Sequence, residues 1–221
     1  ILFAEHNREV TNWQFSQQGG IDYQTRSLGA LHGQLGGEYQ AKNTNTILAA
    51  IDVLQGKAHA KGLPEAPIFK ISEQHVADGF ANVCESTGLQ GRWQTLHQHP
   101  LVVCDTGHNA AGWTYLAEQI TMQKCHHKHI VFGMVDDKDI GAVMDMLPKD
   151  ATYYWTQAST HRAVPSAKVA QMGQQRHLKG DDCGNVEQAY RKAMEKAGQN
   201  DLVFVGGSSY VVADLLALND F

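Results

Sequence analysis

The second half of the chain alternates short, continuously apolar segments with helical patterns, and this alternation constrains the fold more than any other feature. We predict that the apolar segments are strands, at residues 101–104, 129–135, 151–157 and 202–207. Each is followed by a stretch whose apolar residues recur at helical spacing. Short apolar strands that alternate with helices are typical of a parallel sheet covered on both faces. The sequence therefore predicts an α/β fold with a mostly parallel, Rossmann-like sheet.

The first third of the chain is irregular by comparison, with polar, Gly-rich stretches and two helical patterns. In the first pattern apolar residues recur at helical spacing over 47–54, and Asn43 or Thr44 is the expected N-cap. The second helix is expected to start at Ser72 and to run toward Cys84.

A glycine-punctuated connector, STGLQGRWQTL, separates these two regions. Because glycines interrupt regular patterns, we place a domain boundary near residues 88–91 and expect domains at 1–88 and 89–221. The chain has no starting Met and begins in mid-pattern with ILFAEHNREV, so we expect it to be a piece of a longer protein.

The composition argues against several classes of function. A net charge of −5 without a run of Lys or Arg gives no sign of a nucleic-acid partner. No apolar run approaches the roughly 18 residues of a membrane-spanning helix, so we expect no membrane segment. The four cysteines are far apart and form no CxxC pair, which fits a reducing cytoplasm without disulfides or a cysteine zinc site.

The run CHHKH at 125–129 has the composition of a metal-binding tract. Adjacent histidines converge poorly on one ion, however, and no carboxylate or Cys partner has ligand spacing here. We therefore interpret the run as a solvated loop between a helix and a strand, and we expect no metal site in this chain.

The most unusual stretch is LVVCDTGHNAAGW, residues 101–113, in which an acid, a glycine, a histidine and an amide directly follow a buried strand. In open parallel sheets, ligands bind beyond the carboxyl ends of the strands. The polar loops 136–139 and 206–210 follow two further strands and should reach the same edge. Three polar loops at one edge predict a ligand site there.

The residue types alone leave several roles open. Asp105 can accept hydrogen bonds from ribose hydroxyls, or it can cap the following helix. His108 can donate to a phosphate or a carboxylate, or it can simply be solvated. The helix starts at Ala110 and Ser208 offer free N–H groups to anions. Neither GxxxxGK[ST] nor a strand-borne GxGxxG is present, so a dehydrogenase lacks its main sequence support.

The order of the motifs resembles the C-terminal part of folylpolyglutamate synthase / dihydrofolate synthase, within the Mur ligase superfamily. The matching segments are GGEYQAKNTNTILAA, GRWQTL, VVCDTGHN, FGMVDDKDI and LVFVGGSSYVVADLL. The resemblance covers nearly the whole chain. It implies that residues 1–88 are the tail of a central ATPase domain and that 89–221 form a mobile, Rossmann-like C-terminal domain.

The resemblance also implies an activity for the full enzyme. It would be a cytoplasmic, monomeric ATP-dependent amide ligase of folate biosynthesis. ATP would phosphorylate a pteroate or folate carboxylate, and the amine of L-glutamate would attack the acyl phosphate. ATP and Mg²⁺ are the implied cofactors. The P-loop and the principal magnesium ligands would lie upstream, so the fragment alone is expected to be inactive.

Three residues of this chain are implied to bind the nucleotide. Asn43 would contact it from the central domain, and Arg92, in the connector, would reach the ATP phosphates. An arginine suits phosphates because its fork offers several donors. Asp105 would bind the ribose. Domain closure would bring Arg92, Asp105 and His108 over the upstream ATP site.

The remaining implied site residues face the acceptor side of the reaction. His108 would lie near the incoming glutamate or the phosphates as an orienting group. Lys138 and Ser208 are implied for a substrate carboxylate or for loop structure. The family loop usually reads A-H-N-P, whereas this chain has T-G-H-N-A, so Ala110 does not stiffen the helix start as proline would.

Two other functions are consistent with parts of the pattern. One is a non-catalytic Rossmann-like module that binds a nucleotide or a small acid. The other is the C-terminal domain of a cell-wall Mur ligase, against which the GRWQ and GMVDDKD segments argue. Within the folate branch, the sequence leaves open whether the enzyme makes dihydrofolate, extends polyglutamate tails, or does both.

Overall fold

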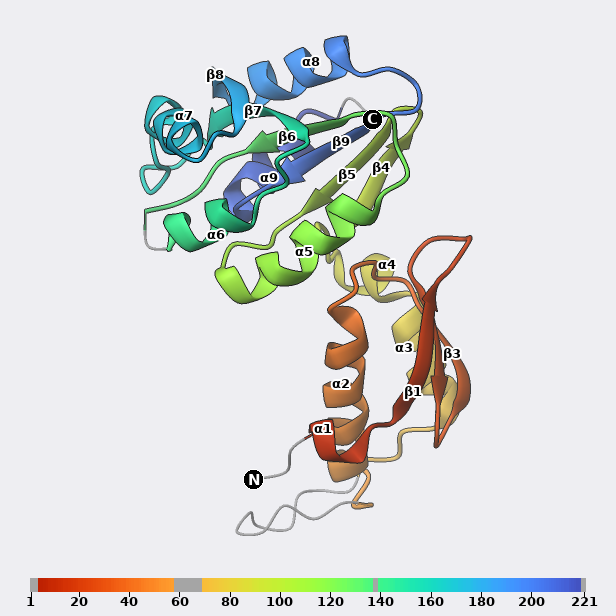
Figure 1. Cartoon of the computed structure of the whole chain (residues 1–221). Helices are drawn as coiled ribbons and strands as arrows, with labels where there is room; N and C mark the ends of the chain where they lie inside the picture. The colour runs from red at the N-terminus through yellow and green to blue at the C-terminus, as the bar shows by residue number, and fades with distance from the viewer. Residues whose placement is uncertain (1–3, 58–68, 137–138, 220–221) are drawn as a thin grey trace. The chain divides into compact units, whose positions relative to one another are not determined.

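The computed structural model describes residues 4–57, 69–136 and 139–219, and it divides the chain into two compact units (Figure 1). Unit 1 is Ile1–Gln90 and unit 2 is Gly91–Phe221. The sequence placed its boundary at 88/89, within the same glycine-rich connector.

Unit 2 is built on a six-stranded sheet in the order β4-β5-β9-β6-β7-β8. The β4 strand pairs antiparallel with β5, and all other neighbours are parallel. This confirms the predicted α/β fold with a mostly parallel sheet. The strands are β4 (Gln94–Gln98), β5 (Leu101–Asp105), β6 (Lys128–Phe132), β7 (Ala151–Gln157), β8 (Lys179–Asn185) and β9 (Leu202–Gly206).

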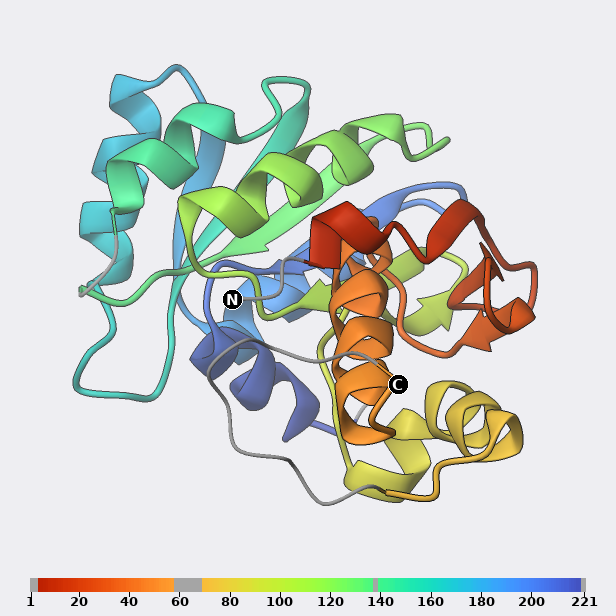
Figure 2. The ribbon, with the colours of Figure 1, turned by 90° about the horizontal axis from the view of Figure 1, so that it is seen from below.

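Helices cover both faces of this sheet. On one face α5 contacts α6, and α6 contacts α7; on the other face α8 contacts α9. Figure 1 shows α5 and α6 below the sheet and α8 above it, and Figure 2 shows α5 and α6 side by side from below. The helices are α5 (Ala110–Met122), α6 (Ile140–Met146), α7 (Ser166–Gln175), α8 (Val186–Lys196) and α9 (Ser209–Leu216).

The central strands are buried on both faces, which is why they read as continuous apolar runs. Under α5 the core is aromatic: the Trp113 ring lies edge-on to Phe132 at 5.4 Å and to Phe204 at 5.9 Å between centroids. The face under α8 and α9 is mainly aliphatic, with Val203 and Val205 fully buried beside Tyr154 and Tyr190. Full burial of such side chains contributes roughly 1.5–3 kcal/mol each.

The CHHKH run does not form a solvated loop throughout: that interpretation is wrong for Lys128 and His129, and for His129 the prediction of a strand from residue 129 is confirmed. Lys128 and His129 begin β6, and they are 8% and 4% exposed. The Lys128 ammonium donates to Asp150 at 2.7 Å. His129 lies between the Tyr154 hydroxyl and the Asp201 carboxylate, at 2.9 and 3.3 Å.

Unit 1 contains a three-stranded antiparallel sheet where the sequence predicted an irregular region. Its buried side chains alternate along β2, where Ile21, Tyr23 and Thr25 point into the core. The strands are β1 (Val10–Phe15), β2 (Ile21–Thr25) and β3 (Gly29–Gly33). The helices are α1 (Ala4–Asn7), α2 (Gln40–Leu54), α3 (Glu73–Ala81) and α4 (Val83–Thr87).

The two helix starts predicted for this unit had different outcomes. The α2 helix begins at Gln40, with Tyr39 as its N-cap, so the prediction of Asn43 or Thr44 as the cap is wrong. Ser72 does cap α3: its hydroxyl accepts from the His75 N–H, and the His75 ring accepts from the Ser72 N–H.

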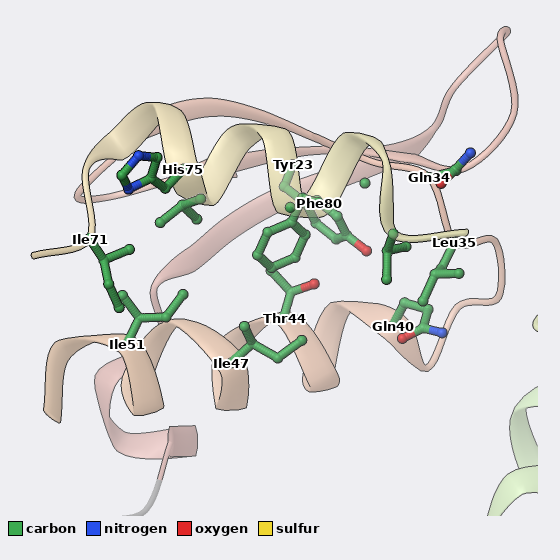
Figure 3. Close-up of a pocket in the computed structure, with 14 residues that line it drawn as sticks. Tyr23, Gln34, Leu35, Gln40, Thr44, Ile47, Ile51, Ile71, His75 and Phe80 are labelled. Atoms are coloured by element: carbon green, nitrogen blue, oxygen red, sulfur yellow. The ribbon is translucent and has the colours of Figure 1, made fainter. Parts of the chain in front are cut away.

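An apolar cleft of about 310 Å³ lies between α2 and α3 in unit 1 (Figure 3). Ile47 and Ile51 enter it from α2, and Phe80 enters it from α3. Tyr23 and Thr44 add hydroxyl groups to its lining. No helix among the described residues is long and apolar enough to cross a membrane.

Candidate functional site

The loop Asp105–Asn109, here called the DTGHN loop, follows β5 at the carboxyl edge of the sheet. Asp105 is only 1% exposed, and its carboxylate accepts the Gly107 N–H and the Trp93 N–H, each at 2.7 Å. Its suggested role as a helix cap is wrong, because Asn109 caps α5 by accepting the Gly112 N–H at 2.8 Å. The acid instead holds the loop to the connector.

Within the glycine-rich connector, residues 91–93 are joined to the same loop at two points, and from here on 'the connector' means these three residues. The Gly91 carbonyl accepts both the N–H and the hydroxyl of Thr106, at 2.9 and 3.1 Å. Two residues later, the Trp93 N–H reaches Asp105, and the Trp93 ring packs on Phe204 at 5.9 Å. Trp93 has a φ of 48°, a left-handed conformation that costs a non-glycine residue roughly 1–3 kcal/mol.

Arg92 lies between these two attachment points and is partly buried. Among the described residues its guanidinium forms neither a hydrogen bond nor an ion pair. A guanidinium offers five donors and stays charged, so a partly buried one is suited to an anionic ligand.

His108 is oriented by its own loop. Its Nδ1 lies 3.0 Å from the Thr106 carbonyl oxygen, which can only accept, so Nδ1 carries a hydrogen in this arrangement. In the neutral ring Nε2 is then the acceptor. Trp113 also donates its indole N–H to the Gly107 carbonyl at 3.1 Å. A Cβ on Gly107 would lie 2.3 Å from the buried Leu116 side chain, so a larger residue here would require Leu116 to shift.

The loop after β9 lies beside the DTGHN loop. Gly206 pairs with Asp105 on one side and with Phe132 on the other. Gly207 has a φ of 100°, and a Cβ there would lie 2.5 Å from the Gly133 carbonyl oxygen. Ser208 is 1% exposed and caps α9. Its geometry supports the loop-structure role among the two predicted for it.

Two further site residues were predicted, Asn43 and Lys138. Asn43 belongs to unit 1, where it is exposed on α2 and donates to the Gln40 side chain at 2.9 Å. Lys138 lies outside the described residues. Asp139, beside it, caps α6 by accepting the Ala142 N–H at 3.0 Å.

The charged groups of the described residues offer no metal centre, since no group of three His, Cys, Asp or Glu side chains could hold an ion. Cys104, next to Asp105, is chemically inert as well. Burial, reinforced by the neighbouring Asp105 charge, raises the pKa of its thiol to about 12. The chemistry available at this edge is therefore anion binding by Arg92 and hydrogen bonding by His108.

Sequence reasoning missed three residues that shape the site: Trp93, Thr106 and Trp113. Trp93 stands within the motif GRWQ, but its bond to Asp105 runs through its backbone N–H, which no spacing rule reveals. The Thr106 hydroxyl bonds 15 positions back along the chain. A signal for Trp113 was available, because an indole in the first turn of a helix after a glycine loop can reach back to the loop carbonyls.

Comparison with known proteins supplies a family context. A dihydrofolate synthase/folylpolyglutamate synthase of Escherichia coli (strain K12) is 30% identical over 80% of this chain, which covers 38% of that relative. The structure of E. coli FolC in complex with DHPP and ADP superposes with a TM-score of 0.69 at 26% identity, over 95% of this chain and 45% of that one.

A Mycobacterium tuberculosis folylpolyglutamate synthase complexed with ADP shares the fold with a TM-score of 0.76, at 21% identity, over 96% of this chain and 47% of that one. The chain thus spans less than half the length of these relatives. The resemblance found in the sequence is confirmed. Residues 91–209 match the Mur ligase, glutamate ligase domain family. Since this match takes in more than half of the sequence, the chain belongs to that family.

Proposed function

We propose that this chain is the C-terminal part of an ATP-dependent ligase that adds L-glutamate to a pteroate or folate carboxylate. Unit 2 would be the glutamate ligase domain, as its family match supports. Residues 1–88 would be the end of a central ATPase domain. The similarity to the E. coli relative, whose structure holds DHPP and ADP, supports a folate acceptor and an adenine nucleotide.

One observation carries the proposal beyond the family match. Arg92 and His108 are held on two segments that are hydrogen-bonded to each other at the carboxyl edge of β5. Ligands of open parallel sheets bind at this edge. Arg92 has no hydrogen-bond or ion-pair partner among the described residues, and it lies on a segment bonded to the loop of His108, at the edge where the fold binds ligands.

The proposed reaction needs both groups. The acceptor carboxylate attacks the γ-phosphorus of ATP, so an acyl phosphate forms and ADP leaves. The glutamate amine then attacks the acyl carbon; the new C–N bond replaces the C–O bond, phosphate leaves, and the amine gives up a proton. Arg92 would stabilise negative charge on the transferred phosphoryl group, which is an electrostatic contribution.

His108 would orient the incoming glutamate. Its Nδ1 hydrogen is used by the Thr106 carbonyl, so the neutral ring presents Nε2 as an acceptor for the glutamate amine. Because the ring is tied to its own loop, it cannot turn freely. Orientation of the nucleophile accounts for a large share of the rate in reactions between two bound substrates.

The roles of the other site residues stay predictions within this proposal. The buried Asp105 carboxylate already holds the loop by accepting backbone N–H groups. It would therefore bind the ribose through a further lone pair. Asn43 would contact the nucleotide from unit 1. Ser208 would act by shaping the α9 start, and Lys138 would meet a substrate carboxylate.

Mg²⁺ is proposed as the companion of ATP, and the family resemblance implies that its principal ligands lie upstream of these residues. No step proposed for Arg92 or His108 runs through the metal. The four free cysteines are compatible with the cytoplasm, where we place the enzyme. Monomeric assembly also stays a proposal.

The test uses the complete polypeptide that carries this chain. ADP release would be followed with ATP, Mg²⁺ and L-glutamate, with dihydropteroate in one reaction and tetrahydrofolate in another. We expect glutamate-dependent turnover with at least one acceptor. Arg92→Ala should reduce it by about 10²–10³, the range seen when one charge-stabilising group is removed.

The matched control is Arg191→Ala, on the exposed surface of α8, where the arginine pairs with Glu187 at 3.0 Å in an i,i+4 ion pair. This variant should keep turnover within about twofold of the parent, as surface changes usually do. Folded protein that shows no turnover with either acceptor would reject the folate assignment. It would favour a cell-wall ligase or a non-catalytic binding module instead.

A further inference from the structure

We propose that Thr106 is a positioning residue that fixes Arg92 relative to His108. The inference rests on the proposed function, because it concerns the same site. Thr106 is hydrogen-bonded both to the segment that carries Arg92 and to His108. Its N–H and hydroxyl donate to the Gly91 carbonyl, next to Arg92, and its own carbonyl accepts from the His108 ring. A single residue therefore links the arginine backbone to the imidazole.

The connector is restrained on both sides of Arg92. On the N-terminal side the Gly91 carbonyl accepts two hydrogen bonds from Thr106. On the C-terminal side the Trp93 N–H is bonded to Asp105, and the Trp93 ring lies against Phe204. Restraints on both neighbours leave the Arg92 backbone little freedom, so only its side chain can adjust.

Close packing makes the Gly91 contact specific. Gly91 has a φ of 72°, and a Cβ there would lie 2.7 Å from the Thr106 methyl group and 3.0 Å from Val212. Thr106 and Val212 thus leave little room for a side chain at Gly91, the residue whose carbonyl the Thr106 hydroxyl reaches. This is the fit expected of a residue that supports a functional side chain rather than one that contacts the ligand.

Because the restraint lies within unit 2, Arg92 and His108 would keep their separation whatever movement the unit makes. The phosphoryl group on Arg92 and the glutamate beside His108 would then meet at a fixed distance. A misplacement of about 1 Å in such a pair can cost on the order of 10²-fold in rate. We therefore place the effect of Thr106 on kcat, and not on the affinity for ATP.

The experiment is a double-mutant cycle in the complete polypeptide. Thr106→Val keeps the shape and the backbone bond to Gly91 but removes the hydroxyl, so folding should be retained. It should lower kcat about tenfold, with KM for ATP changed less than about threefold. Thr106→Ser keeps the hydroxyl and should stay within about twofold of the parent.

In an Arg92→Ala background, Thr106→Val should lower the residual kcat by less than about twofold, since the group it positions is gone. An equal loss in both backgrounds would show that Thr106 acts independently of Arg92 and would overturn the inference. So would an unchanged kcat for Thr106→Val alone.

A second measurement separates this inference from the proposed function. If the parent shows no glutamate-dependent ADP release, the proposed function fails, and the restraint is judged by amide hydrogen exchange in the 221-residue chain. The Thr106 and Trp93 positions should exchange about tenfold faster in Thr106→Val than in Thr106→Ser, because the connector loosens. Equal exchange rates in the two variants would show that the Thr106 hydroxyl does not restrain the connector, and would overturn the inference.

Discussion

The Asp105 carboxylate accepts a 2.7 Å hydrogen bond from the backbone N–H of Trp93, 12 positions earlier in the chain. The bond joins the end of a buried strand to the connector at the start of unit 2. The other carboxylate oxygen accepts the Gly107 N–H at 2.7 Å. Two backbone donors thus converge on one buried acid, which sets the shape of the DTGHN loop and of the connector together.

Replacing Asp105 should therefore destabilise unit 2 in a graded way. Asp105→Ala leaves two backbone N–H groups without their acceptor and should cost about 3 kcal/mol, since hydrogen bonds to charged groups contribute roughly 1.5–3 kcal/mol each. Asp105→Asn keeps one acceptor oxygen and should cost about half as much. Urea unfolding followed by near-UV circular dichroism would measure both. Equal midpoints for the parent and the alanine variant would contradict this role.

Asn109→Ala should weaken the start of α5. The Asn109 side chain accepts the Gly112 N–H at 2.8 Å, and loss of such a cap costs about 1 kcal/mol. For a unit of this size the loss corresponds to a fall of about 2–4 °C in Tm. Asn109→Asp serves as the control, because aspartate caps equally well and suits the helix N-terminus. Calorimetry that finds both variants equally destabilised would rule out a capping role.

The sequence was most informative where both faces of a strand are buried. Strands β5, β6, β7 and β9 are continuous apolar runs, so their parallel arrangement could be predicted. Strands β4 and β8 are edge strands with mostly exposed side chains, and the segment KGDDCGN of β8 carries no apolar pattern. Pairing with β7 through the backbone, rather than side-chain burial, makes it a strand.

In unit 1 the sequence does contain a strand pattern, but the pattern is short. Buried and exposed residues alternate in IDYQT of β2, and glycines bound the strand on its N-terminal side. Five residues of alternation are easily masked by neighbouring polar stretches. At the site, Asp105, His108 and Asn109 stood out by residue type. The Asp105 carboxylate and the Thr106 hydroxyl each bond to a backbone group of the connector, the Trp93 N–H and the Gly91 carbonyl, and backbone partners carry no side-chain signature in the sequence.

The glycines at the carboxyl edge make a further prediction. Gly207→Ala places a Cβ 2.5 Å from the Gly133 carbonyl oxygen and forces a φ of 100° on a non-glycine residue. Since the obstacle is backbone, the substitution should cost at least about 2 kcal/mol. Gly112→Ala is the matched control in the same unit, with its nearest atom at 3.4 Å. Its helical position should gain about 0.5–1 kcal/mol.

Urea midpoints of these two variants should shift in opposite directions. A destabilised Gly112→Ala would point to an unrecognised constraint in the first turn of α5. A neutral Gly207→Ala would show that the β6 and β9 loops can separate, and that the close approach of Gly207 to Gly133 is not required by the fold.

His129, at the opposite edge of the sheet, should make the stability of unit 2 depend on pH. Burial is the largest influence and lowers the pKa of His129 below its ordinary value of 6.5, although the bond to Asp201 acts in the other direction. The neutral ring fits its neighbours. Burial raises the pKa of Tyr154, so its hydroxyl stays protonated and can donate to Nδ1, while Nε2–H donates to Asp201.

Because the unfolded chain binds a proton at His129 more readily than the folded one, stability should fall as pH drops below about 6.5 and level off below the folded pKa. Asp201 behaves differently. Burial alone would raise its pKa, but the Gly198 and His127 N–H groups and the His129 ring hold that pKa below 3.8, so its contribution to stability is lost only at more acidic pH.

In His129→Gln the fall in stability near pH 6 should disappear. Urea unfolding from pH 7.5 to 4.5 would show this, and parallel profiles for the parent and the variant would assign the titration to another group.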